Sequence, residues 1–204
     1  MKVTILDGYI DEPACLGVPP FISPQVRAAA GAAISAGAEV EYITIDKIRK
    51  NNAELNSDVT LFMSGNAVPG KYLRAMPASK KEVLEISCHI PGVSIIGGPA
   101  ALDSEMCSSF DYSSKNDPAV SLYEILKGKE VSQRLRNLEE WNEWQIKGAH
   151  IVKDHPDFPD PLIAEVESYR GCIRYKSGGC SFCIEPLKGE PLFRQPSDII
   201  EECA

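Results

Sequence analysis

Short apolar runs alternate with helix-forming segments through residues 1–130 of this 204-residue chain. Runs that are nearly continuous and bounded by turn residues are typical of strands buried on both faces of a parallel sheet, which need helices as crossovers. Five segments are predicted to be strands: VTIL at 3–6, EVEYITID at 39–46, DVTLFMSG at 58–65, VSIIGG at 93–98 and FDYSS at 110–114. The alternation therefore predicts an α/β domain with a doubly wound parallel sheet.

The helices expected between these strands have recognisable end signals. Ser23 stands as an N-cap before Pro24, and Gly37 follows an alanine-rich body at the point where a helix should stop. Ser79 is placed to cap a second helix, which would turn one apolar face towards the sheet. A third helix is predicted in AVSLYEILKG at 119–128.

Residues 131–161 are predicted to connect this domain to the last segment of the chain. The segment 131–147 is charged and helix-prone, with Trp141 and Trp144 one turn apart on the same face. We expect both tryptophans to serve in packing. HPDFPDP at 155–161 has three prolines within seven residues, which excludes a helix or a central strand and indicates a linker.

The last segment, 162–204, is predicted to begin with a strand and to end with a helix. LIAEVES at 162–168 is the strand candidate, and it leads directly into a group of cysteines. PSDIIEECA at 196–204 is the helix candidate, with Ser197 or Asp198 as its cap. Its apolar spacing predicts one buried stripe made of Ile199, Ile200, Cys203 and Ala204.

Composition excludes several classes of protein. The formal net charge of -8 gives no global field for binding phosphate backbones, so nucleic acid is not indicated as a partner. No segment approaches the ~20 apolar residues of a membrane span. The apolar run at the amino terminus ends at Asp7 and Gly8, too early for a secretion signal. We therefore expect a cytoplasmic protein.

Three of the seven cysteines, Cys172, Cys180 and Cys183, lie close together in the sequence. In a reducing compartment, clustered thiols favour a metal or catalytic role, and zinc, an iron–sulfur cluster, a redox pair or no function are all open. Structural zinc normally takes four ligands, whereas three thiolates leave one iron of a [4Fe-4S] cluster free. Gly178 and Gly179 would let the loop between the thiols fold back tightly.

The other four cysteines are predicted to play no part in such a site. Cys203 could complete a four-thiolate site, but its position in a helical pattern favours burial in the core. Cys15, Cys88 and Cys107 are isolated and are expected to be small buried hydrophobic residues.

RGCIRYKSGGCSFCIEP at 170–186 resembles the cluster loop of radical S-adenosylmethionine (radical SAM) enzymes, whose common pattern is CxxxCxxC with an aromatic residue before the last cysteine. Phe182 has that aromatic place, and the resemblance implies that it lies near the bound S-adenosylmethionine. The resemblance implies that Cys172, Cys180 and Cys183 each bind one iron of a [4Fe-4S] cluster, while S-adenosylmethionine chelates the fourth. Its reductive cleavage would yield a 5'-deoxyadenosyl radical that abstracts hydrogen from a substrate. The first gap departs from the family pattern, with seven residues instead of three.

A second resemblance concerns the amino-terminal part. DEPACLGVPPFISP at 11–24, the helix after it and VSIIGGP at 93–99 resemble the domain before the barrel in cobalamin-type radical enzymes, which implies a flavodoxin-like fold for residues 1–130. Gly97 and Gly98 could let a corrinoid or nucleotide approach the backbone, or simply form a tight strand-to-helix turn. Cobalamin is therefore a possible cofactor.

The corrinoid signature DxHxxG is nonetheless absent, so a histidine ligand to cobalt is not supported. None of the three histidines, His89, His150 and His155, has an aspartate two residues before it. For His150 and His155 we expect surface or helix-capping roles.

Together these patterns predict the amino-terminal fragment of a radical SAM Fe-S enzyme with an unknown substrate and reaction. The resemblance implies ferredoxin or flavodoxin as the electron donor; the catalytic residues are unknown. Residues 162–204 would form the first strand, cluster loop and first helix of a truncated barrel, since a (β/α)₈ barrel takes ~250 residues, and the fragment alone should be inactive. The alternative is an α/β cofactor- or partner-binding module whose cysteines hold structural zinc or form a non-catalytic cluster.

Overall fold

The computed structural model describes residues 1–9, 22–51, 54–65 and 76–204. Its centre is a five-stranded parallel sheet in the order β2-β1-β3-β4-β5. The strands are β1 (Lys2–Asp7), β2 (Glu39–Thr44), β3 (Val59–Met63), β4 (Val93–Gly97) and β5 (Tyr112–Ser113). This order and the crossover helices confirm the predicted doubly wound, flavodoxin-like α/β fold.

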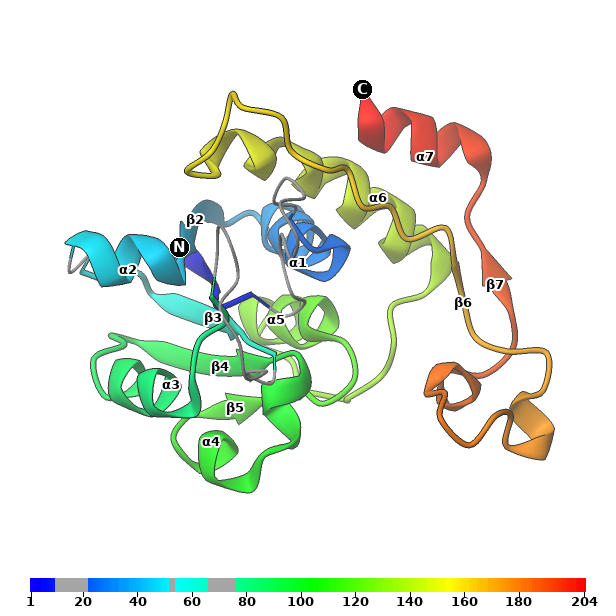
Figure 1. Ribbon diagram of the computed structural model, residues 1–204, viewed down its shortest axis with the longest axis horizontal. Helices are drawn as coiled ribbons and strands as arrows, with labels where there is room; N and C mark the ends of the chain where they lie inside the picture. Colours follow the sequence, from blue (N-terminus) through cyan, green and yellow to red (C-terminus); the bar gives the residue numbers. More distant parts are fainter. Residues whose placement is uncertain (10–21, 52–53, 66–75) are drawn as a thin grey trace.

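Helices cover both faces of the sheet (Figure 1). On one face lie α1 (Pro24–Ser35) and α5 (Pro118–Leu126), with α6 (Leu138–Gly148) packed against α1. On the other face lie α2 (Ile45–Asn51), α3 (Lys80–Ser87) and α4 (Ser104–Ser108). Neither α2 nor α4 was predicted from the sequence, since they are only seven and five residues long. In the described parts of the chain, no helix has the length and apolar character to cross a membrane.

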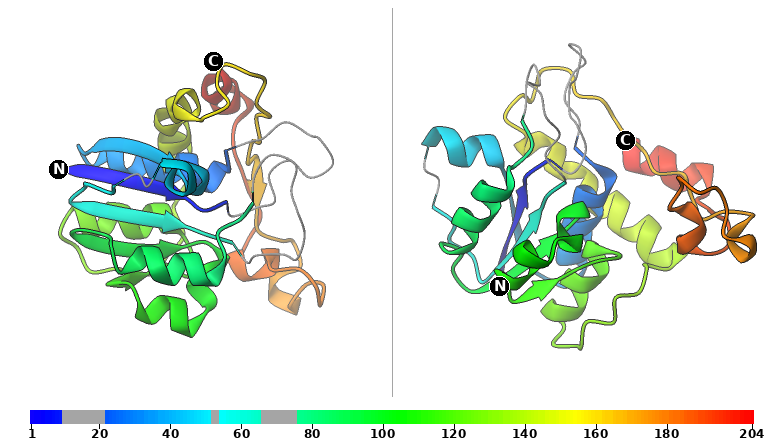
Figure 2. Two further views of the ribbon diagram at one scale, coloured as in Figure 1. Left: turned by 60° about the vertical axis from the view of Figure 1, so that its left-hand side comes forward. Right: turned by 60° about the horizontal axis from the view of Figure 1, so that its bottom comes forward.

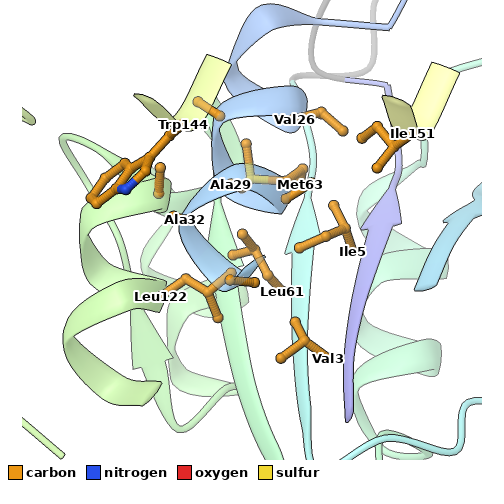
Figure 3. Packing of buried hydrophobic residues seen from close by; sticks show 14 of the residues in the cluster. Val3, Ile5, Val26, Ala29, Ala32, Leu61, Met63, Leu122, Trp144 and Ile151 are labelled. Carbon is orange, nitrogen blue, oxygen red and sulfur yellow. The ribbon is translucent and has the colours of Figure 1, made fainter. Parts of the chain in front are cut away.

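The larger core lies between α1 and the sheet (Figure 3). Val3 and Ile5 of β1 and Leu61 and Met63 of β3 point towards α1, because alternate residues of a strand face the same side. The helix presents alanines to them, and these small side chains are all fully buried. Short side chains let the helix lie close to the strands, so the alanine-rich sequence is explained by packing.

Two glycines allow α1 and α6 to cross in close contact. A methyl group on Gly31 would lie 1.8 Å from the carbonyl oxygen of Trp144, and one on Gly148 would lie 1.8 Å from that of Arg27. Gln145 adds a hydrogen bond across the same interface, from its Nε2 to the carbonyl of Pro24 at 2.9 Å. The helix that leads to the cysteine region is therefore fixed firmly on the α/β domain.

The predicted helix ends are confirmed for α1 and α3. Ser23 accepts a hydrogen bond from the Gln25 backbone, and Gly37, just after the end of α1, has a positive φ of 88°. Ser79 forms a capping box with Glu82.

The helix predicted over 131–147 is shorter than expected. It begins only at Leu138, because Asn137 and Glu140 form a capping box that starts α6 there. The 3-10 turn η3 (Ala149–Asp154) then leads into the proline-rich segment.

The segment 162–168 corrects a further expectation, because it forms no regular strand. Apart from an isolated bridge at Ile163 it is irregular, and pairing begins only at β6 (Tyr169–Arg170). This strand pairs antiparallel with β7 (Leu192–Phe193). In the part of the chain that the structure describes, no strand of the central sheet pairs with 162–168, so an extended, alternating sequence is not sufficient to make it a strand.

The final helix, α7 (Pro196–Cys203), begins as expected but turns a different face inwards. Its N-cap is Gln195, not Ser197 or Asp198. The predicted buried stripe is wrong: Ile200 and Cys203 are exposed, whereas Glu202 is buried. Glu202 lies inwards because it forms ion pairs with the buried side chains of Arg27 and Arg194.

Candidate metal centre

The loop that carries the three cysteines begins after β6 and ends before β7, and these two short strands pair with each other. Tyr169 lies opposite Phe193, with ring centroids 4.8 Å apart, and Arg170 lies opposite Leu192. The backbone N–H of Cys172 then donates to the carbonyl of Gly189 at 3.0 Å. We call residues 171–191 the thiol loop. It projects beside the α/β domain and is drawn in orange in Figures 1 and 2.

The thiol loop is held in shape by two 3-10 turns, η4 (Tyr175–Ser177) and η5 (Glu185–Lys188). Gly178 and Gly179, which were predicted to let the loop fold back tightly, both have positive φ angles, of 83° and 67°. A side chain on Gly179 would meet the ring of Pro186 at 2.1 Å, so this position needs glycine for space as well as for conformation.

Two carboxylates tie the turns of the loop to its ends. Glu185 accepts hydrogen bonds from the Gly171 backbone at 2.9 Å and from Lys188 at 2.6 Å. Burial opposes ionisation of Glu185, but Lys188 and the Gly171 N–H outweigh it and lower the pKa of this carboxyl. Glu190 accepts from the hydroxyl of Tyr175 at 2.8 Å, which raises the pKa of Tyr175.

Two of the three thiols lie around one arginine. The backbone N–H of Arg174 lies 3.3 Å from the Sγ of Cys172, and its guanidinium lies 3.9 Å from the Sγ of Cys180. Cys183 follows one turn later, with its N–H donating to the carbonyl of Cys180 at 3.1 Å. The deprotonated thiolate is the form of cysteine that binds metal.

The three thiols do not yet surround a common point. Among the residues that the structure describes, no three Cys, His, Asp or Glu side chains are placed to hold a metal ion together. The donor set of three soft sulfurs on one loop fits an iron–sulfur cluster chemically. Their arrangement, with Arg174 next to two of them, does not. Loading a cluster would therefore require the loop to adjust.

The surface of the thiol loop is unusually apolar. Phe182, predicted to lie near S-adenosylmethionine, is 88% exposed, and Ile173 and Leu187 are exposed to a similar degree. A cavity of about 410 Å³ lies between the loop and the amino-terminal end of α1. It is lined by residues 23–25 at the start of α1, by residues 165–169, and by Glu185 and Lys188 of the loop.

Gly97 and Gly98 are explained by contacts within the α/β domain. A side chain on Gly97 would lie 2.8 Å from the sulfur of Met63 and 2.9 Å from the ring of Pro118. Gly98 has a φ of 79°, and a side chain there would meet the carbonyl oxygen of Ser64 at 2.6 Å. These contacts account for a tight strand-to-helix turn, and a corrinoid or nucleotide at this place stays a prediction.

The remaining cysteines differ from expectation where the structure describes them. Cys88 is exposed rather than buried, because it lies at the solvent-facing end of α3, and Cys107 is half-buried. Cys203 is exposed because α7 turns Glu202 inwards instead. Cys15, with most of the segment 11–24, lies outside the described residues.

The histidines have local structural partners. His150 is exposed, and its Nδ1 lies 2.9 Å from the carbonyl of Lys147 near the end of α6, which agrees with a capping role. His155 is not on the surface: it is buried against Tyr42, and its Nδ1 accepts from the Asp157 backbone at 3.1 Å. Burial lowers the pKa of His155.

Comparison with known proteins gives two kinds of relatives. An uncharacterised protein of Methanocaldococcus jannaschii is 41% identical over 98% of this chain, and one of Archaeoglobus fulgidus is 36% identical over 99%. The chain spans only 41% and 37% of the length of these two curated relatives. No family model matches the chain.

Two of the solved structures that it resembles are of the same protein. TsrM from Kitasatospora setae, a radical S-adenosylmethionine methyltransferase with cobalamin and a [4Fe-4S] cluster bound, matches with a TM-score of 0.62 and 14% identity. Its structure with tryptophan substrate and a SAM analogue gives 0.60 and 16%. The matches cover 99% of this chain and 45% and 44% of TsrM. At this identity the likeness shows the α/β fold alone.

Proposed function

We propose that this chain carries a [4Fe-4S] cluster on Cys172, Cys180 and Cys183 and belongs to a radical SAM enzyme. The observation that carries the proposal is the thiol loop itself, which places three of the described thiols on one self-contained segment joined to a flavodoxin-like domain. The fold likeness to TsrM supports it, because TsrM was solved with a [4Fe-4S] cluster and has a similar fold over nearly this whole chain.

Distinct roles are proposed for the three cysteines, Arg174 and Phe182 of the thiol loop. The three thiolates would each bind one iron, and the fourth iron would bind S-adenosylmethionine, whose reductive cleavage supplies the radical. Arg174 would have to leave its present position between Cys172 and Cys180. Phe182, exposed beside the last thiol, would flank the cofactor. The reaction and substrate of the whole protein are not assigned.

Cobalamin is a second, separable part of the proposal. TsrM was solved with cobalamin bound, and this chain has the same kind of fold. Its sequence has no DxHxxG motif, so any corrinoid would bind here without the histidine ligand that this motif supplies.

Anaerobic reconstitution with ferrous iron and sulfide tests the cluster. We expect about four irons per chain with broad visible absorbance, and loss of both in the triple variant Cys172→Ala, Cys180→Ala, Cys183→Ala. Each single substitution should lower iron content, because each removes one of three ligands.

Cys88→Ala is the matched control, since Cys88 is an exposed thiol at the end of α3, outside the thiol loop. It should load iron normally. Stoichiometric zinc without iron uptake, or full iron content in the triple variant, would contradict the proposal and favour the alternative of a zinc-holding module.

A further inference from the structure

One aromatic ring contacts both ends of the thiol loop. Arg170 immediately precedes the loop, and its guanidinium carbon lies 4.8 Å from the centroid of Trp141. Arg194 follows the loop after β7, and its guanidinium carbon lies 5.9 Å from the same centroid. From the sequence, Trp141 was assigned to packing only, and the pairing of these arginines with it depends on tertiary structure.

The entry side of the loop is anchored at the start of α6. Arg170 is buried, and its Nη2 donates to the carbonyl oxygen of Arg136, just before the cap of α6. Arg136 is in turn paired at 3.2 Å with Asp117 and with Glu167.

The exit side is anchored one turn further along the same helix. Arg194 is buried, and its Nε donates to the Oδ1 of Asn142 at 2.8 Å. Its Nη1 donates to the carbonyl of Glu167 at 3.1 Å and to the carboxylate of Glu202. The two arginines therefore reach α6 from the end of β6 and from the residue just after β7, with the indole as their shared contact.

Trp141 is suited to hold both cations in place. It is fully buried, and its indole N–H has no hydrogen-bond partner among the described residues. Trp141 therefore stabilises the arginines through its ring. The cation–π attraction between a guanidinium and an aromatic ring is stronger away from water than at an exposed site. The helix beneath it is fixed on α1 by the crossing of Gly31 and Gly148.

We propose that Trp141 is a positioning residue that fixes the thiol loop relative to the α/β domain by binding Arg170 and Arg194. The reason for such a role rests on the proposed function, since a cluster on the loop has to be held at a fixed position beside the domain. We call the contact of Trp141 with Arg170 and Arg194 the clamp. Its effect on the loop can be tested in the metal-free chain.

The test measures how fast each cysteine of the metal-free chain reacts with N-ethylmaleimide, resolved by peptide mass spectrometry. In Trp141→Leu, labelling of the half-buried Cys172 and Cys180 should rise roughly tenfold, the factor expected from losing about 1.4 kcal/mol of cation–π stabilisation. Trp141→Phe keeps an aromatic ring and should stay near the wild-type rate. Cys88, remote at the end of α3, is the internal reference and should not change.

Trp144→Leu is the matched control. Trp144 is equally buried in the same helix, but its ring packs on Tyr123 at 5.3 Å and not on the two arginines. It should lower overall stability without raising the labelling of Cys172. Equal increases in the two leucine variants, or no increase in Trp141→Leu, would overturn the proposal.

Two further measurements test the role of Trp141 if the leucine variant does not fold or if the chain is loaded with iron. If Trp141→Leu does not fold, Arg170→Met removes the charge and keeps most of the apolar stem, and it should raise the labelling of Cys172 in the same way. In the reconstituted chain, Trp141→Leu should shift the reduction potential of the cluster, whereas Trp144→Leu should not. Failure to load iron would contradict the proposed function and leave the labelling result to decide on the clamp.

Discussion

Replacing Gly148 by alanine should destabilise the protein by about 3 kcal/mol or more, beyond the usual range for one added methylene in a core. The backbone of Gly148 has a φ of -84°, which alanine adopts freely, so the loss comes from space alone. The new methyl would lie 1.8 Å from the carbonyl oxygen of Arg27. A helix backbone cannot move aside as a flexible side chain can, so α6 and α1 would have to separate.

Urea denaturation followed by circular dichroism gives the loss directly. Gly37→Ala is the control, because nothing lies within 4 Å of the added methyl and only its φ of 88° is unfavourable. Its cost should be about 1 kcal/mol. Equal losses in the two variants would show that the crossing of α1 and α6 is not as close as described.

Replacing Glu202 by alanine should cost about 3–5 kcal/mol, because it leaves buried cations without a partner. The Oε1 of Glu202 lies 2.7 Å from Arg27, and its other oxygen binds Arg194. Both arginine side chains are almost fully buried, so water cannot replace the carboxylate. We expect α7 to detach first, which hydrogen exchange of its amides would detect.

The neighbouring Glu201 provides the comparison. It is exposed on the same turn of α7, and Glu201→Ala should change stability by less than about 0.5 kcal/mol. If Glu202→Ala and Glu201→Ala are equally mild, the buried ion pairs do not hold α7 in place.

Local sequence signals predicted the α/β domain well. Apolar runs bounded by turn residues identified all five strands, and Ser23, Gly37 and Ser79 identified helix ends. These signals work because a buried strand and a helix cap each depend on residues close in the sequence. The same local reasoning failed for 162–168, where the pattern suits a strand but, within the described residues, the segment joins neither the central sheet nor the β6–β7 pair.

The residues missed at the candidate site depend on distant partners. Periodicity predicted that Ile200 and Cys203 would face inwards, but Arg27, far away in the sequence, draws Glu202 inwards instead. Likewise, Trp141 was assigned to packing, and its contact with Arg170 and Arg194 follows only from the fold. The thiols were identified from their spacing, yet the position of Arg174 between two of them could not be.

The most direct test of the central claim is the electron paramagnetic resonance spectrum of the reduced, reconstituted chain with and without S-adenosylmethionine. Three thiolate ligands leave one iron open, so S-adenosylmethionine should change the spectrum, and a magnetic isotope in its carboxylate should broaden the lines. The triple cysteine variant should give no cluster signal. A normal cluster spectrum that S-adenosylmethionine leaves unchanged, or a chain that takes up zinc and no iron, would contradict a radical SAM role for this loop.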